Sequence, residues 1–149
     1  MGQHSSDQIL EKQTVVIDAS VAAKWYLEEE HSDHARRLRD SFVLGTVTIS
    51  VPALLLYETL NALKYSGVYD EKELEAAASS LSKYGFEVFQ PTGELYRETA
   101  HDSVRHDISV YDASYIALST HLKVPLFTVD REILDKFPRK ARHISAFKE

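Results

Sequence analysis

Two aspartates follow directly on short apolar runs that are typical of buried β-strands. Asp18 follows the run VVI at 15–17, and Asp130 follows the run FTV at 127–129. In an open parallel sheet, ligands bind outside the carboxyl ends of the strands, so acids at these positions are candidates for a chemical role. Aspartate is also a favoured N-cap, and each of the two precedes a predicted helix. Taken singly, each residue fits capping as well as chemistry.

Two further acids lie inside predicted helices. In ALLLYETLNALKY (53–65), Glu58, Asn61 and Tyr65 share one face at spacings of three and four. This face is either a solvent-facing strip or one side of a site. Asp112 lies in the apolar segment SVYDASYIALS (109–119). A carboxylate is rarely buried in such a segment unless it has a partner or a function. The local reason is a capping-box-like pair with Ser109, although the usual partner is the longer Glu or Gln.

The four carboxylates predict metal chemistry if the fold brings them into one crevice. Carboxylates that leave water together repel one another, so they either take up protons or bring in a cation. Hard oxygen ligands favour Mg²⁺ or Mn²⁺. The chain has no cysteine and no HExxH helix, so nothing indicates a zinc hydrolase site. His31 and His34 lie one turn apart without a third nearby ligand, and we expect them at the surface.

The elements that must position these acids alternate along the chain. Such alternation predicts an α/β fold, with a central parallel sheet of about five strands, right-handed crossovers and helices on both faces. The predicted strands are 14–18, 47–51, 86–89, 125–129 and a weak 141–145. The predicted helices are 20–28, 31–42, 53–66, 71–84, 92–105, 110–122 and 131–137.

Size and composition indicate one globular domain. The 149 residues fit a single core over 14–149, preceded by a polar and flexible lead-in at 1–13. No apolar run is long enough to span a bilayer and no secretory signal is present, so we expect a cytoplasmic protein with no membrane contact. The net charge is -6, but residues 121–149 carry seven basic against four acidic side chains. That segment, at +3, could steer a polyanion toward a metal-filled cleft.

Four segments together resemble one family. They are VVIDASVAAKWYL (15–27), PALLLYETLNAL (52–63), ISVYDASYIALS (108–119) and LFTVDREIL (126–134). In this order they resemble the PIN-domain nucleases, specifically the VapC-type toxins of toxin–antitoxin pairs. The resemblance covers about Val15 to Ile144, and the tail before Thr14 departs from it.

The resemblance implies a site and partners. It implies that Asp18, Glu58, Asp112 and Asp130 form an acidic quartet that holds Mg²⁺ or Mn²⁺. Ser20 and Thr128 are then polar neighbours of the metal or its waters, and Asn61 is a supporting polar residue. The implied activity is hydrolysis of RNA phosphodiester bonds, and the implied partners are RNA, a cognate antitoxin and a second copy of the chain. Candidate phosphate contacts are Lys24, Arg131, Lys136 and Arg139.

Other functions fit parts of this pattern. A catalytically inactive PIN-fold module that binds RNA or protein shares the fold, although the intact acids speak against it. A magnesium-dependent phosphatase with an aspartyl nucleophile commonly has a second Asp two residues on, where this chain has Ser20. A receiver domain needs an acidic pair at the first strand's end, but Ile17 and Ala19 flank Asp18. A metal-free carboxylate hydrolase is distinguished by chelation.

Overall fold

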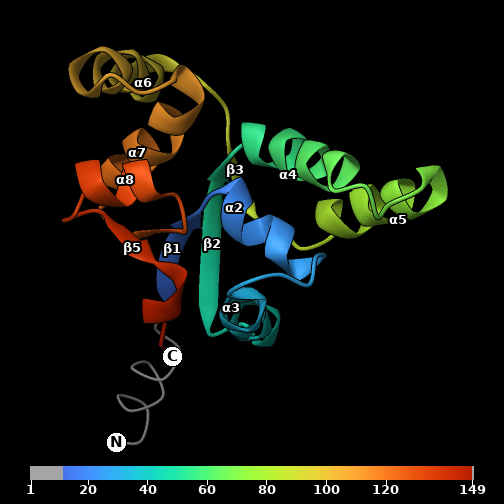
Figure 1. The fold of residues 1–149 in the computed structure, drawn as a ribbon. Coiled ribbons are helices and arrows are strands. Elements are labelled where there is room, and N and C mark those ends of the chain that lie inside the picture. The colour runs from blue at the N-terminus through green and yellow to red at the C-terminus, as the bar shows by residue number, and fades with distance from the viewer. Residues whose placement is uncertain (1–11, 149) are drawn as a thin grey trace, which may run out of the picture.

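The computed structural model describes residues 12–148, which form five strands and the helices around them (Figure 1). The strands are β1 (Gln13–Ile17), β2 (Val47–Pro52), β3 (Glu87–Phe89), β4 (Leu126–Thr128) and β5 (Ala141–His143). All pair in parallel, in the order β3-β2-β1-β4-β5. The predicted α/β fold with a five-stranded parallel sheet is confirmed.

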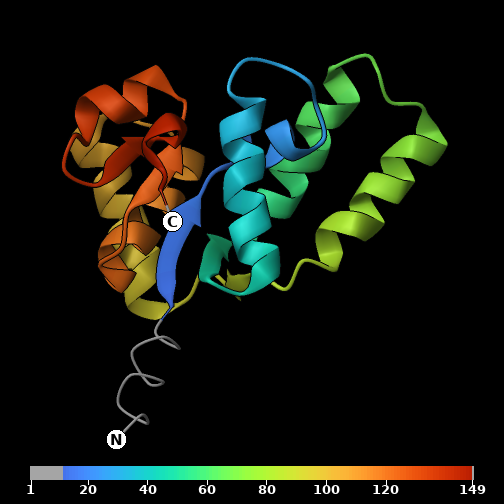
Figure 2. The ribbon, with the colours of Figure 1, turned by 90° about the horizontal axis from the view of Figure 1, so that it is seen from below.

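Helices cover both faces of the sheet. They are α2 (Ala19–Ala22), α3 (Ser32–Leu44), α4 (Leu54–Tyr65), α5 (Glu71–Ser82), α6 (Gly93–His106), α7 (Val110–Leu122) and α8 (Arg131–Lys136). The strand order runs one way from β1 to β3 and the other way from β4 to β5, so right-handed crossovers place the two sets of helices on opposite faces. Figures 1 and 2 show α3, α4 and α5 on one side and α6, α7 and α8 on the other.

The reversal of strand order creates a crevice between β1 and β4. The chain leaves β1 toward β2 but leaves β4 toward β5, so the two crossovers diverge from neighbouring strands. Ile17 of β1 is in register with Phe127 of β4, which brings the residues after both strands together. Ligands in open α/β sheets bind at this kind of switch point. The fold therefore directs attention to the segments that follow β1 and β4.

The core is built on the two central strands and α7. Val15, Val16 and Ile17 of β1 are fully buried, as expected for a parallel strand covered on both faces. In α7, every residue from Tyr115 to Ser119 is buried. The prediction that this helix is largely buried is confirmed for its middle, whereas Val110 and Tyr111 in its first turn are exposed.

Three boundaries differ from the prediction. The helix predicted at 20–28 is only the four residues of α2, followed by a 3-10 turn η1 (Ala23–Trp25). The turn is fixed because the Trp25 indole Nε1 donates to the carbonyl oxygen of Ala35 at 2.9 Å. Gln13, predicted in the lead-in, is the first residue of β1, while residues 1–11 lie outside the described chain. The weak last strand ends at His143, and a 3-10 turn η2 (Ile144–Ala146) replaces its end.

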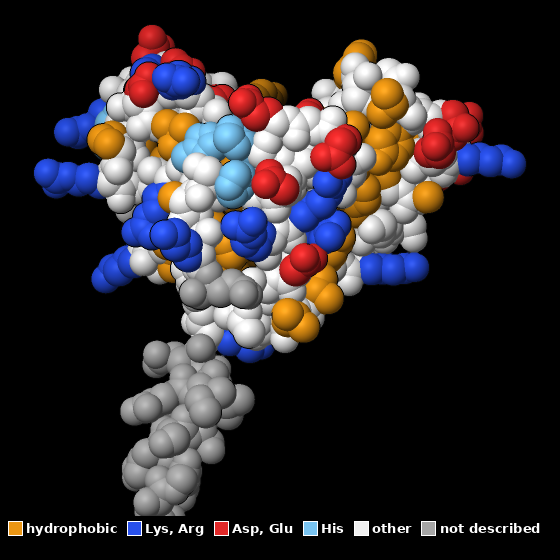
Figure 3. Space-filling view, turned by 60° about the horizontal axis from the view of Figure 1, so that its bottom comes forward, with side chains coloured by type: hydrophobic (Ala, Val, Ile, Leu, Met, Phe, Trp, Pro, Cys, Tyr) orange, Lys and Arg blue, Asp and Glu red, His pale blue; other side chains and the backbone are white. Residues whose placement is uncertain are grey.

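Three histidines gather on one face of the molecule (Figure 3). The predicted pair is present, with the ring centroids of His31 and His34 5.6 Å apart. The ring of His143 joins them, 4.5 Å from that of His31. The side chains of His31 and His34 are each 29% exposed, so they are partly buried rather than freely solvated.

No helix within residues 12–148 has the length and apolar character needed to cross a bilayer.

The buried face of α4 contains one unusual polar group. Leu55, Thr59 and Leu63 form this face, and all three are fully buried. The Thr59 hydroxyl has no hydrogen-bond partner among residues 12–148. A buried polar group without a partner lowers the stability of the folded state, because no hydrogen bond offsets the hydration that it loses.

Replacing this hydroxyl by a methyl group tests the cost. We expect Thr59→Val to raise the free energy of unfolding by about 1 kcal/mol, because valine has nearly the same shape and nothing to desolvate. Thr99→Val is the matched control: Thr99 is also a buried helical residue, but its hydroxyl donates to the Leu95 carbonyl at 2.9 Å, so its loss should lower stability by about 0.5–1.5 kcal/mol. Urea unfolding measures both, and destabilisation by Thr59→Val would show that the hydroxyl has a partner.

Candidate active site

Asp18 is held at the switch point by hydroxyl groups from both neighbouring segments. It follows the last residue of β1 and caps α2, where its Oδ1 accepts from the Ser20 backbone N at 3.1 Å and from the Ser20 Oγ at 2.6 Å. Its Oδ2 accepts from the Thr128 Oγ1 at 2.5 Å. Thr128 ends β4 and is fully buried. The two interpretations of Asp18 are therefore compatible, because Oδ1 caps α2 while Oδ2 accepts from Thr128 at the end of β4.

Asp130 is fixed beside Asp18 by the same hydroxyl. The Thr128 Oγ1 accepts from the Asp130 backbone N at 3.0 Å while it donates to Asp18. The Ser20 Oγ accepts from the Val129 backbone N at 3.2 Å, which joins the segment after β1 to the segment after β4. Asp130 also caps α8 through its Oδ1, which accepts from the Ile133 N at 3.0 Å. The sequence-predicted neighbours Ser20 and Thr128 thus brace two acids.

Glu58 reaches the site from α4 and has a partner that the sequence did not indicate. Its Oε1 accepts from the Tyr115 hydroxyl of α7 at 2.6 Å. Tyr115 is 2% exposed, and this burial raises the pKa of its hydroxyl. The negative charges of Glu58, Asp18 and Asp112 raise it further. This tyrosine therefore lies among three of the four predicted acids. Its position one turn after Asp112 on α7 was the one available signal.

Asp112 stands in the first turn of α7. The predicted capping interaction is present, because the Ser109 Oγ accepts from the Asp112 backbone N at 3.0 Å. That bond uses the backbone of Asp112 and leaves its carboxylate for another role. Burial raises the pKa of the Asp112 carboxyl, and the negative charges of Asp130 and Glu132 raise it further.

The four acids form one electrostatic unit. Burial raises the pKa of Asp18 from 3.8 to about 6 against the lowering effect of its hydrogen bonds, and Asp130 adds to the rise. Burial likewise raises the pKa of Glu58, with a further rise from Asp112. Within residues 12–148, no lysine, arginine or histidine lies within ion-pair distance of any of the four. The site has negative charge with no protein cation to balance it.

This donor set suits a hydrated hard cation. In the described part of the chain, no three His, Cys, Asp or Glu side chains stand close enough to hold an ion directly between them. Mg²⁺ usually keeps several of its waters and binds through one or two carboxylates, so a looser arrangement of oxygen ligands fits it. All the side chains gathered here offer oxygen rather than nitrogen or sulfur. The residues fit Mg²⁺ or Mn²⁺ and do not fit zinc.

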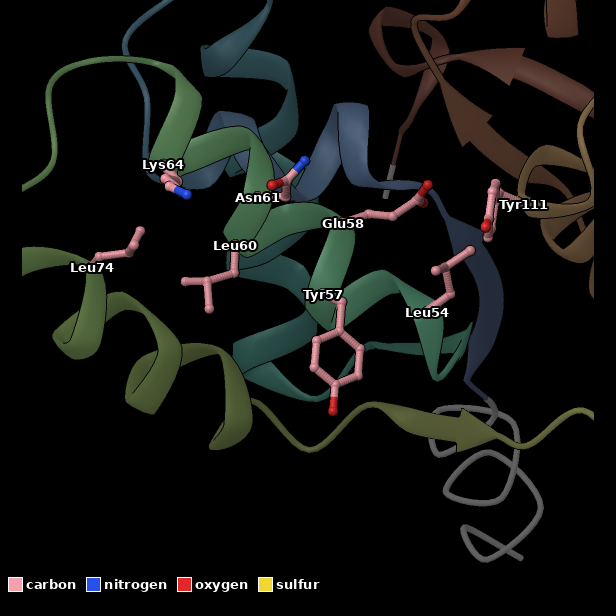
Figure 4. Close-up of a pocket in the computed structure, with 8 residues that line it drawn as sticks. All are labelled: Leu54, Tyr57, Glu58, Leu60, Asn61, Lys64, Leu74 and Tyr111. Atoms are coloured by element: carbon pink, nitrogen blue, oxygen red, sulfur yellow. The ribbon is translucent and has the colours of Figure 1, made fainter. Parts of the chain in front are cut away.

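A groove leads away from Glu58 between α4 and α5 (Figure 4). It measures about 480 Å³ and is lined by Leu54, Tyr57, Glu58, Leu60, Asn61, Lys64, Leu74 and Tyr111. Asn61, predicted as a supporting polar residue, is exposed in this groove one turn from Glu58. Tyr57 and Tyr111 are 78% and 61% exposed, which is high for side chains of this size.

Two predicted phosphate contacts are engaged elsewhere. Lys24 is only 6% exposed, and its Nζ pairs with Glu29 at 2.7 Å. The Lys136 Nζ donates to the backbone carbonyls of His106 and Asp107 at 2.9 and 3.1 Å, at the end of α6. The sequence could not show these partners because they come from other elements. Arg131 and Arg139 are exposed, as a phosphate contact requires.

Known proteins share this sequence and this fold. The PIN domain family matches residues 15–140. Ribonuclease VapC3 of Pyrobaculum aerophilum is 31% identical over 132 residues, which are 83% of this chain and 95% of that protein. The solved structure of PAE2754 from Pyrobaculum aerophilum is 26% identical, covers 91% of this chain and 93% of its own, and aligns with a TM-score of 0.61.

A more distant structure shows a likeness of fold alone. A toxin–antitoxin complex from Klebsiella pneumoniae is 10% identical and aligns with a TM-score of 0.65 over 87% of this chain and 97% of that chain. The family match, by contrast, rests on the sequence and spans all four acids and both bracing hydroxyls. On that match, the chain belongs to the PIN domain family.

Proposed function

We propose that this protein is a divalent-metal-dependent endoribonuclease and the toxin of a toxin–antitoxin pair. One observation carries the proposal: four carboxylates gather at the switch point of the sheet with no cation of residues 12–148 in ion-pair distance, and burial together with neighbouring acids raises the pKa of Asp18, Glu58 and Asp112. The 31% identity to a ribonuclease over most of both chains supports the same reaction class. The cation makes the negative net charge compatible with a polyanionic substrate.

Each acid has a proposed role. Asp18 and Asp112 hold one divalent ion, Mg²⁺ or Mn²⁺, directly or through waters. Glu58 and Asp130 complete this shell or help to recruit a second ion when the substrate arrives. When bound, the ion supplies charge neutralisation for the scissile phosphate and activation of the attacking water. In-line hydrolysis then leaves a 5′-phosphate and a 3′-hydroxyl.

The surrounding hydroxyls keep the acids in place for this chemistry. Thr128 and Ser20 hold both oxygens of Asp18, which fixes the carboxylate plane. Tyr115 stays neutral beside the acids and donates to Glu58, so it orients that carboxylate without adding charge. Preorganised ligands lose little entropy when the ion and the substrate bind. Tyr115 is therefore a positioning residue in this scheme.

The partners follow from the groove and the family. The exposed aromatic side chains beside Glu58 suit an antitoxin segment, which would cover the acids when it binds there. The complex from Klebsiella pneumoniae is a toxin–antitoxin assembly of the same fold. The homodimer and the cytoplasmic location expected from the sequence stay predictions.

Neutralising a metal-holding acid should stop the reaction. We expect Asp18→Asn and Asp112→Asn to lower RNA cleavage by about 10²–10³-fold or more, because each removes charge stabilisation that acts at the scissile phosphate. Total RNA is incubated with each purified protein in Mg²⁺, in Mn²⁺ and in EDTA, and the new ends are mapped. Asp40→Asn makes the same change at an exposed acid whose ion pair within residues 12–148 is with Arg39, and it should cleave like the wild type. Undiminished cleavage in EDTA would refute the proposal.

The metal-free protein should be strained by its ionised Asp18. Because the folded-state pKa is raised to about 6 from 3.8, the contribution of Asp18 to stability is full below pH 4 and is lost as the pH rises through about 6. We expect Asp18→Asn to be more stable than the wild type by about 1–2 kcal/mol at pH 7.5 and nearly equal at pH 4.5.

Urea unfolding in EDTA at the two pH values measures this difference. Added Mg²⁺ should then stabilise the wild type more than Asp18→Asn, since ligand binding to the folded state alone raises stability. A difference that is the same at both pH values would show that ionised Asp18 is not destabilising.

A further inference from the structure

A second hollow lies beside Asp130, away from the groove along α4. It is a cleft of about 490 Å³, and Val129 and Arg131, the two neighbours of Asp130 in the chain, are among the residues that line it. His31 and His143 line it as well. The cleft shares Lys24 and Val129 with a smaller hollow of about 390 Å³ that reaches Ser20 at the switch point. The two hollows therefore share lining residues between Ser20, which contacts Asp18, and the histidines.

The histidine rings in this cleft are held in a fixed arrangement. The rings of His31 and His143 meet edge to face, with centroids 4.5 Å apart. His31 has a left-handed backbone, with φ of +68°, which is uncommon for a residue other than glycine. The Nδ1 of His143 accepts from the Ser145 backbone N at 3.1 Å, so in the neutral ring the Nε2–H is the free donor. Burial and the neighbouring His31 lower the pKa of His143, which favours this neutral form.

Arg131 is the uncommitted cation of the cleft. It is exposed, and its side chain makes no ion pair or hydrogen bond within residues 12–148. The charge of Lys24 is already balanced by Glu29 at 2.7 Å. Glu30 and Asp135 also line the cleft, so it is not a basic patch that would attract any anion. A ligand here has to offer an aromatic face as well as a phosphate.

We propose that this cleft is a nucleotide subsite, which receives one base and one phosphate of the RNA strand next to the scissile bond. The base packs against the imidazole rings of His31 and His143, and Arg131 contacts the phosphate. This inference rests on the proposed ribonuclease function and assigns the direction in which the strand leaves the acids.

Three properties favour a single-stranded RNA over a protein segment. The volume is in the range of small-ligand pockets and suits one nucleotide. Single-stranded RNA is recognised by stacking of splayed bases on aromatic and histidine side chains, together with basic contacts to its backbone. Val129 and Arg131 flank Asp130 in the chain and line the cleft, so the cleft lies where a strand with its scissile phosphate at the acids could continue.

Binding by a catalytically silent protein tests the subsite. In the Asp112→Asn background, a labelled unstructured RNA 12-mer is titrated without divalent metal and followed by fluorescence anisotropy. His31→Asn removes the ring and keeps a side chain that tolerates the left-handed backbone. We expect it to weaken binding about fivefold or more through lost stacking. Arg131→Gln should weaken binding and reduce the slope of log Kd against log salt by about 0.7, as one lost phosphate contact requires.

Two matched controls carry the same changes outside the cleft. His101→Asn and Arg105→Gln alter exposed residues of α6 and should leave the RNA affinity unchanged. In the active background, His31→Asn should raise KM and leave kcat nearly unchanged. RNA substrates are then shortened stepwise, from the 5′ end in one series and from the 3′ end in the other. In one of the two series the KM difference between the wild type and His31→Asn should disappear, because the shortened strand no longer reaches the subsite.

The outcomes separate the two proposals. If the wild type cleaves RNA but both cleft variants bind and cleave like their controls, the subsite is refuted and the nuclease stands. If the variants keep their RNA affinity but lose affinity for the cognate antitoxin, the cleft is a protein contact and the proposal is likewise refuted. If the wild type cleaves no RNA under any metal condition, the proposed function fails and the subsite fails with it.

Discussion

The burial of carboxylates that also repel one another, at the junction of β1 and β4, is the constraint on which this structure depends. Burial raises the pKa of Asp18 to about 6, and the negative charge of Asp130 adds to that rise. Such an arrangement costs folding free energy unless a cation or protons offset it, and proteins retain costly groups of this kind chiefly at functional sites. Within residues 12–148 the protein offers no basic partner, so the compensation has to come from outside the chain.

Buried elements and shared hydroxyl groups hold the acids together despite their repulsion. β1 is buried on both faces and α7 is buried from Tyr115 to Ser119, so the elements that carry Asp18 and Asp112 are anchored in the core. Thr128 donates to Asp18 and accepts from the backbone of Asp130, and one side chain thereby sets the spacing of two acids. The Tyr115 hydroxyl of α7 donates to Glu58 and thereby orients that carboxylate. Flexible surface residues could not hold like charges together in this way.

Sequence patterns predict the parts of this design that are local or that follow from topology. The run before Asp18 and the run before Asp130 identify strand ends, and a parallel sheet then brings the two acids together. Contacts between distant segments were not predictable: Tyr115 and Glu58 are 57 residues apart, and no periodicity links them. His143 joins His31 because β5 ends beside the start of α3, which depends on the strand order. The helix predicted at 20–28 was wrong because a tertiary bond from Trp25 outweighs local propensity.

Metal binding by the resting protein tests the central claim most directly, since it needs neither substrate nor partner. Metal-free protein is titrated with Mn²⁺ by calorimetry, and free Mn²⁺ is counted by electron paramagnetic resonance. If the four acids act as one unit, replacing any of them should weaken Mn²⁺ binding by about tenfold or more. The variants are Asp18→Asn, Glu58→Gln, Asp112→Asn and Asp130→Asn. Wild-type affinity in all four variants would contradict the account, because the carboxylates would then share no ion.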